Sequence, residues 1–248
     1  MAQEPQWHAN SVWAIPVPVN GTSLSIPTSH SRFGTSLVAF MTTTNSTELL
    51  GNLRGATITA TLQIVETNSP MWWFGNDCGT GVRFPNVRLF FTTNPEVYNL
   101  DHANANELEF WWAKEAYAQV REGTVTLTAH LDPSKWGDSQ GHSGETEPYR
   151  TGFLSAASRV AQIGLSFGGG CFFDTGVGIY NPENPESGAA LILLEYKALR
   201  PRLVMDGIEP RVEGAFEPFE VQYSNNLKDW RDMPAIEPSN IRFYRIKP

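Results

Sequence analysis

Short segments of alternating apolar and polar residues, each bounded by turn-forming residues, recur along most of this chain. The clearest is "TVTLTAHL". Its apolar residues, Val125, Leu127, Ala129 and Leu131, occupy alternate positions, and its threonines occupy positions between them. Because strand side chains alternate between two faces, this segment predicts a strand with one buried and one wet face. With it, about eight segments between residues 11 and 199 are candidate strands. The other seven are "SVWAIPVPV", "TSLVAFMTT", "ATITATLQIVE", "NVRLFFTT", "ELEFWWAKE", "AQIGLSFGG" and "GAALILLEYKAL".

This pattern predicts an all-β fold. The only helical window is "FLSAASRV", residues 153 to 160, which has apolar residues at helical spacing and no glycine or proline. About eight antiparallel strands suit a jelly-roll-like β-sandwich, which we expect over residues 10–199. Shorter strand-like segments follow "LEYKALRPRL". Residues 200–248 are therefore predicted to form a small C-terminal β segment, either packed on the sandwich or folded as a reduced fibronectin-III-like unit.

The charge balance disfavours two classes of partner. Lys and Arg number 18 against 26 Asp and Glu, for a net charge of -8. Such a surface repels nucleic acid and anionic membranes. No run approaches the roughly 18 apolar residues of a membrane-spanning helix, and residues 1 to 20 lack the pattern of a signal peptide. The low charged fraction of 18%, with 21 Gly and 17 Pro, is typical of extracellular β proteins, so we expect an extracellular or cell-surface location.

The glycine-rich stretch "IGLSFGGGCFFDTGVGIY", residues 163 to 180, does not predict a nucleotide site. A phosphate-binding loop needs a lysine after its glycines, and a dinucleotide fingerprint must lead into a helix. Neither feature is present here. Glycines in this setting more commonly serve a bulge or a strand corner.

The two cysteines, Cys78 and Cys171, can form one disulfide or remain two buried thiols. We favour the disulfide, because two cysteines 93 positions apart make neither a four-ligand zinc site nor a C-x-x-C redox pair. Both lie in similar glycine-bearing segments, "NDCGTG" and "GGCFFDTG". A bridge would bring Asn76, Asp77 and Asp174 close together. Their oxygens could hold a structural calcium ion, although loop aspartates more often cap turns.

The order of several segments resembles a family of poorly characterised bacterial secreted β-sandwich proteins. The resemblance rests on "SRFGTSLVAF", "VRLFFTT", a Trp-Trp pair, "GTVTLTAHLDPSKWGDSQGHSG" and "VAQIGLSFGGGCFFDTGVG". It spans residues 10–199 and implies export and a sandwich similar to carbohydrate-binding modules, without an established activity. Separately, "FEVQYSNNLKDWRDM" and "RFYRIKP" resemble the short sandwich tails of bacterial exported proteins.

Eight tryptophans give the strongest hint of function. Trp111 and Trp112 are adjacent in a predicted strand, so in a two-layer sheet one indole should face outward. We expect this to be Trp111, on one strand face with Glu107 and Glu109. An outward indole beside carboxylates can stack on a sugar ring while the carboxylates take its hydroxyls. The predicted ligand-binding residues are Trp111, Glu109, Glu107, Trp72, Trp73 and Trp136, with loop packing as the alternative for Trp136.

These features lead to the hypothesis of a non-catalytic protein that binds a polysaccharide or other glycan. Two alternatives remain: a structural or adhesive domain that self-assembles through its aromatic residues, and a glycan-degrading enzyme. Catalysis lacks support, because Glu107 and Glu109 would approach a substrate from the same side. His130 and His142 flank the Trp136 segment, but two histidines do not make a metal site.

Overall fold

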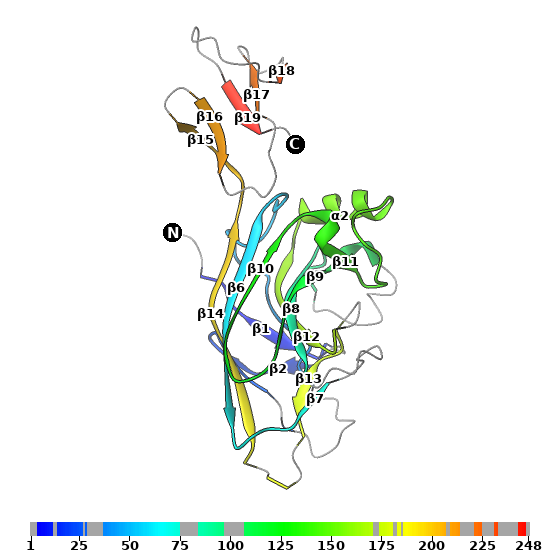
Figure 1. The fold of residues 1–248 in the computed structure, drawn as a ribbon, viewed down its shortest axis with the longest axis vertical. Coiled ribbons are helices and arrows are strands. Elements are labelled where there is room, and N and C mark those ends of the chain that lie inside the picture. The colour runs from blue at the N-terminus through cyan, green and yellow to red at the C-terminus, as the bar shows by residue number, and fades with distance from the viewer. Residues whose placement is uncertain are drawn as a thin grey trace.

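The structure, a computed structural model, is a β-sandwich of two antiparallel sheets (Figure 1). The predicted all-β antiparallel sandwich is therefore confirmed. The structure describes residues 4–11, 14–26, 28, 37–74, 84–96, 107–170, 174–180, 183–184, 186–206, 209–213, 221–224, 231–232 and 243–246.

Within these residues the larger sheet has seven strands and the smaller has five. In spatial order the seven are β11 (Trp136–Asp138), β9 (Phe110–Gln119), β8 (Asn86–Thr92), β12 (Gln162–Gly168), β5 (Phe40–Thr43), β1 (His8–Asn10) and β2 (Pro16–Val17). The five are β10 (Gly123–His130), β6 (Thr57–Thr67), β14 (Gly188–Leu199), β4 (Ser23–Ser25) and β3 (Val19–Asn20). A further pair, β7 (Trp72–Phe74) and β13 (Val177–Ile179), joins near the start of β5 through a bridge between Val38 and Val177.

The main core lies between the two large sheets. Apolar residues at alternate positions of β6 and β14 meet apolar residues of β8 and β12, as the period of two requires. Fully buried members include Leu62, Leu191, Leu89, Phe91 and Leu165. This burial supplies the main driving force for assembling the sandwich.

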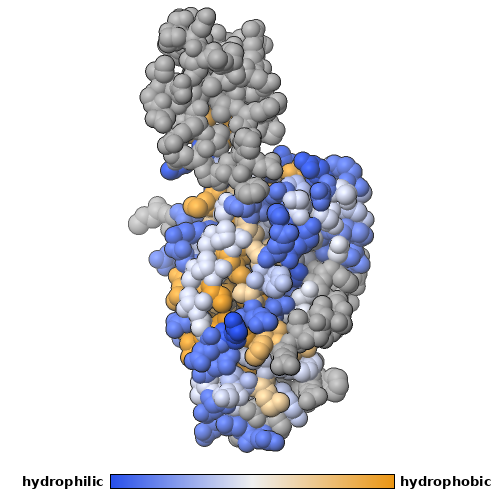
Figure 2. Space-filling model, viewed as in Figure 1, coloured by the Kyte–Doolittle hydropathy of each residue, from blue (hydrophilic) through white to orange (hydrophobic). Residues whose placement is uncertain are grey.

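The outer face of the five-stranded sheet is exposed to solvent along β10, as "TVTLTAHL" predicts. Two threonines of β10 lie opposite threonines of β6, and both pairs of hydroxyls are within hydrogen-bonding distance, Thr61 with Thr126 and Thr59 with Thr128. Threonine suits such a position, because its branched side chain packs on the pleated surface while its hydroxyl meets water. Figure 2 shows hydrophilic residues over the end that carries the helix and apolar surface along the middle of the sandwich.

The middle of the seven-stranded sheet differs, because both of its faces are buried there. All seven residues of β8 and all seven of β12 are buried. On the face away from the five-stranded sheet, Phe40, Phe90, Phe110 and Trp112 form a second apolar cluster with Ala39. Large apolar residues thus face both sides of this part of the sheet, a pattern usual for sheets covered on both sides.

The helix α2 (Tyr149–Ala157) begins and ends earlier than predicted from "FLSAASRV". It buries Phe153, Ala156 and Ala157 against the core. Two short 3-10 helices, η1 (Glu107–Glu109) and η2 (Pro133–Lys135), precede β9 and β11. No helix among the described residues has the length and apolar character needed to cross a bilayer.

The strands after β14 pair only among themselves, within the described residues. β15 (Arg202–Asp206) pairs with β16 (Glu209–Glu213), and β17 (Val221–Ser224) pairs with β18 (Arg231–Asp232) and β19 (Phe243–Ile246). Figure 1 shows these strands beyond one end of the sandwich. β14 ends at Leu199, and a domain boundary near this residue stays a prediction.

Candidate functional site in the outer layer of the seven-stranded sheet

The candidate site is the face of the seven-stranded sheet that points away from the five-stranded sheet. Strand pairing places its side chains on one face, and Asp174 joins them through its contacts with Arg88 and Ser166. We call these residues the outer layer, and each has at most 6% of its surface exposed. The outer layer consists of Asn10, Phe40, Thr42, Arg88, Phe90, Thr92, Phe110, Trp112, Gln162, Ser166 and Asp174.

The middle of the outer layer is aromatic. The ring centroid of Phe90 lies 4.9 Å from that of Phe40, 5.0 Å from that of Trp112 and 6.5 Å from that of Phe110. Phe90 and Phe40 belong to strands on either side of β12, so their rings meet across that strand. Gly164 lies opposite Phe90 in the register, and a β-carbon there would collide with the Met41 carbonyl oxygen on β5.

One end of the outer layer holds a buried ion pair. The Nε of Arg88 donates to the Oδ2 of Asp174 over 2.7 Å, and the Ser166 hydroxyl donates to the same oxygen. The Arg88 guanidinium also lies 5.9 Å from the ring centroid of Trp112. The positive charge is thereby matched by a carboxylate and an aromatic face, as a buried arginine requires.

Other buried polar atoms in this part of the molecule are not matched in the same way. The Nε2 of Gln162 donates to the Thr42 hydroxyl over 2.9 Å. The Oε1 of Gln162 and the Oδ1 of Asp174, however, have no hydrogen-bond partner in the structure. A buried acceptor without a donor costs about 1–3 kcal/mol, so both atoms mark places where a donor group is missing.

The expectation that Trp111 faces outward is wrong. Trp111 and Trp112 do point to opposite faces of β9, but both side chains have 0% exposure. Trp111 lies in the main core, where its ring is 5.1 Å from that of Phe153 at 88° and its Nε1 donates to the Leu108 carbonyl. The prediction assumed that a two-layer sandwich leaves one face of each sheet open, whereas this sheet is covered on both faces.

The predicted strand face of Glu107, Glu109 and Trp111 is also wrong. Glu107 and Glu109 lie in the 3-10 helix η1, and β9 begins only at Phe110. The Glu109 carbonyl accepts a hydrogen bond from the Thr93 amide, which joins η1 to the end of β8. The alternation that would align these carboxylates with Trp111 does not extend back to them.

The remaining predicted tryptophans lie apart from the outer layer. Trp136 begins β11, is fully buried in the main core and donates from Nε1 to the His130 carbonyl over 2.7 Å. Trp72 and Trp73 belong to the short strand β7, and both are half-buried. The Trp72 indole donates to the Glu66 carboxylate over 2.9 Å.

The disulfide and the calcium site stay predictions. Cys78, Cys171, Asn76 and Asp77 lie outside the described residues. Asp174 is described, and its Oδ2 is taken by Arg88 and Ser166. The described residues contain no group of three or more His, Cys, Asp or Glu that could hold a metal ion.

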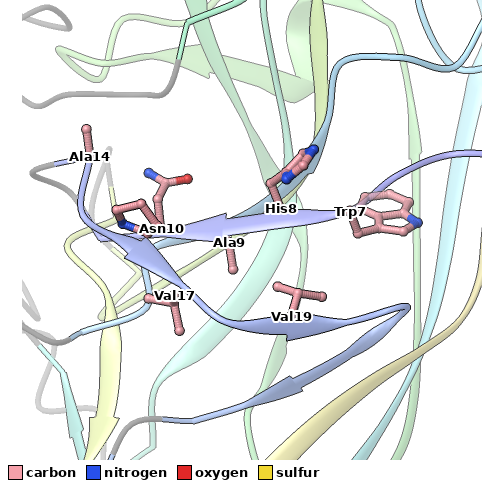
Figure 3. Close-up of a pocket in the computed structure, with 8 residues that line it drawn as sticks. Trp7, His8, Ala9, Asn10, Ala14, Val17 and Val19 are labelled. Carbon is pink, nitrogen blue, oxygen red and sulfur yellow. The ribbon is translucent and has the colours of Figure 1, made fainter.

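A small cavity of about 230 Å³ lies at the edge of the sandwich, beside β1 and the β2–β3 segment (Figure 3). Figure 3 shows Val19 on the side of Ala9, whereas His8 and Asn10 point to the other side of β1. The Trp7 ring at one end lies 5.2 Å from that of Tyr196. The cavity is mostly apolar and contains none of the tryptophans for which we predicted a ligand role.

One local feature of the sequence does indicate the outer layer. Aromatic residues are adjacent in two strands, Phe90 with Phe91 and Trp111 with Trp112. Adjacent positions face opposite ways, so two neighbouring aromatic pairs indicate a sheet that is covered on both faces. Polar residues within these mostly apolar strands then indicate which of the two covered faces also holds polar groups. They are Arg88, Gln162 and Ser166.

The fold defines an antiparallel β-sandwich with an aromatic and polar outer layer on its larger sheet. No protein-family model matches the chain, and no curated protein matches it. Among solved structures, the chain is similar to a "xylan-binding module CBM15", at 11% identity and a TM-score of 0.35. That match covers 79% of this chain and 96% of the module. A similarity of this degree carries no information about the ligand of this chain.

Proposed function

We propose that this chain is an extracellular protein that binds carbohydrate, without transforming it, through the outer layer. One observation carries the proposal. A cluster of aromatic rings and two buried acceptors without donors, Gln162 Oε1 and Asp174 Oδ1, occur on a face that the main core does not use. An aromatic pocket with a few well-placed polar groups is the usual composition of a ligand site.

Carbohydrate fits this composition better than a purely apolar ligand. A sugar ring has an apolar face of C–H groups, which can pack on Phe90 or Trp112, and a rim of hydroxyls that donate hydrogen bonds. Those hydroxyls would give Gln162 Oε1 and Asp174 Oδ1 the donors that they lack. A hydrocarbon ligand would leave both acceptors buried and unpaired.

The carboxylate content of the outer layer supports binding rather than hydrolysis. Glycoside hydrolysis ordinarily uses two carboxyl groups on either side of the scissile bond. The outer layer as defined above contains one carboxylate, Asp174, and its Oδ2 is held by Arg88 and Ser166.

The outer layer is closed to solvent, since each of its residues has at most 6% of its surface exposed. Binding there requires a conformational change, so association should be slower than the ordinary 10⁵–10⁷ M⁻¹s⁻¹ for a preformed surface, roughly below the lower end of that range.

Two matched tryptophan variants test the proposal. Trp111→Phe and Trp112→Phe make the same chemical change at adjacent positions on opposite faces of β9. In pull-down assays on insoluble polysaccharides and in titrations with soluble ones, Trp112→Phe should weaken saturable binding roughly tenfold. Trp111→Phe should leave the affinity within about twofold of the original protein.

Three results would contradict the proposal: no saturable binding to any polysaccharide, equal losses in both variants, or release of reducing sugar by the original protein. Far-ultraviolet circular dichroism and the unfolding midpoint would show that both variants are folded.

A further inference from the structure

We infer that two copies of this chain pair through β10 and form a dimer with a continuous sheet. β10 belongs to the five-stranded sheet and takes no part in the outer layer, so the dimer is independent of the proposed function. β10 is the last strand of its sheet, and within the described residues no strand lies beyond it. An edge of this kind offers unpaired amides and carbonyls to another chain.

β10 lacks the features that usually protect an edge strand. The other strands at the ends of the two large sheets, β2, β3 and β11, have two or three residues each, whereas β10 has eight. Its sequence, "GTVTLTAH", contains no proline, lysine or acidic residue, and its register with β6 has no bulge. Short length, charge, proline and bulges are the usual means of keeping an edge from pairing. Of these four edges, β10 is therefore the one most open to another strand.

The threonines of β10 direct their backbone groups away from β6. The Leu131 amide donates to the Ala56 carbonyl over 2.8 Å, and this pair continues the register of β10 with β6. Hydrogen-bonded and non-hydrogen-bonded positions alternate in an antiparallel pair, so Thr124, Thr126 and Thr128 are of the second kind. Their amides and carbonyls therefore point to the open edge, and all three residues are exposed.

The end of the open edge determines the register of the dimer. The His130 carbonyl already accepts a hydrogen bond from the Trp136 indole over 2.7 Å. The open backbone groups thus extend from Thr124 to Thr128, with Thr126 in the middle. An antiparallel pairing about a two-fold axis at Thr126 places Thr124 opposite Thr128 of the second copy. Each open amide then faces an open carbonyl.

The side chains of β10 suit a second copy as the partner. In this register threonine meets threonine on the outer face, and on the inner face Val125, which is half-buried, meets Leu127 of the second copy. Glu122 directly precedes β10, and it comes close to His130 of the second copy at each end of the interface. A carboxylate thus meets an imidazole instead of a like charge. A two-fold interface must be self-complementary, and these pairs meet that requirement.

Sedimentation velocity of the full chain over a range of concentrations tests for this dimer. The protein should dimerise with a dissociation constant below about 100 μM. Thr126→Lys should raise that constant at least roughly tenfold, because two like charges meet at the two-fold axis. Ser25→Lys is the matched control, because it adds the same charge at an exposed position of β4 in the same sheet. It should leave the constant within about twofold of the original value.

Amide hydrogen exchange, followed by NMR, identifies the strand that pairs. The amides of Thr124, Thr126 and Thr128 should exchange quickly in dilute protein and slowly in concentrated protein. The Leu127 amide faces β6 and should be protected at both concentrations.

Three results would each overturn the inference and leave the proposed function standing. They are a monomer at all concentrations up to about 100 μM, equal dissociation constants for the two lysine variants, and a dimer in which the threonine amides of β10 still exchange quickly. Far-ultraviolet circular dichroism shows whether each variant is folded. If Thr126→Lys does not fold, Thr126→Pro replaces it, because proline is tolerated where an edge amide faces solvent and still removes a hydrogen bond of the dimer.

Discussion

The Nε of Arg88 lies 2.7 Å from the Oδ2 of Asp174, and the two side chains are 7% and 0% exposed. The two residues are 86 positions apart in the chain, and their contact ties β8 to the segment that follows β12. A buried pair of this kind gives little net stability compared with apolar residues, but the loss of one partner leaves a buried charge without compensation.

Asp174→Ala should therefore lower the free energy of unfolding by about 3–5 kcal/mol, measured by urea denaturation. The double variant Arg88→Met with Asp174→Ala should be more stable than Asp174→Ala alone, because no uncompensated charge remains. The matched control is Glu115→Ala, which breaks the exposed 2.9 Å pair of Glu115 and Lys135 and should change little. Comparable losses in Glu115→Ala and Asp174→Ala would count against this interpretation of the ion pair.

Phe153 of α2 should make a large contribution to stability, because its ring packs between the two tryptophans of the main core, Trp111 and Trp136. Its ring lies 5.1 Å from Trp111, 5.8 Å from Phe91 and 6.3 Å from Trp136, measured between centroids. Phe153→Ala should destabilise the protein by about 3–5 kcal/mol, because it leaves a cavity among rings that cannot close around it. Leu154→Ala on the same helix should cost less, since Leu154 is only half-buried. Thermal unfolding of both variants checks this order, and a reversed order would refute it.

Tyr196 should make stability depend on pH in the alkaline range. The side chain as a whole is half-buried, but its hydroxyl points into the sandwich and donates to the Gly164 carbonyl over 3.2 Å. Burial raises the pKa of Tyr196 well above its ordinary value, which is about 10. The folded state thus holds this proton more tightly than the unfolded state does. The stabilisation is complete below about pH 10 and is lost as the pH rises from there toward the folded-state pKa.

Two tyrosine variants isolate this contribution. In urea unfolding between about pH 9 and 11, Tyr196→Phe should flatten the fall in the free energy of unfolding with pH. Tyr117→Phe removes a tyrosine that is 56% exposed and should leave the slope unchanged. If the slope is the same in both variants, Tyr196 does not control it.

Much of the fold could be predicted from local pattern, because strand alternation and turn residues are properties of neighbouring positions. "TVTLTAHL" became β10, with its leucines inward and its threonines outward. The start of the helix could not be predicted equally well, because Tyr149 and Arg150 are not apolar at helical spacing and are held by contacts outside the window. The beginning of β9 was misplaced for a similar reason, since "ELEF" continues the alternation although Glu107 and Glu109 form a 3-10 turn.

The site was harder to predict, because it depends on what covers each sheet. Alternation tells that Trp111 and Trp112 face opposite ways but not whether either face is open. Likewise, no spacing rule joins Arg88 to Asp174 or Gln162 to Thr42, since these contacts form only when strands distant in the chain become neighbours. The adjacent aromatic pairs are a local sign that both faces of the sheet are covered. They indicate that an outer layer exists, but they do not identify the polar residues that belong to it.

Fluorine NMR of the protein labelled with 5-fluorotryptophan tests most directly whether ligands bind at the outer layer. The signals of Trp111 and Trp112 can be assigned by replacing each residue with Phe. On titration with a bound glycan, the Trp112 signal should shift and saturate with the binding curve, while the Trp111 signal stays in place. A shift of Trp111 without a shift of Trp112, or saturable binding with neither signal moving, would contradict a ligand site on that face.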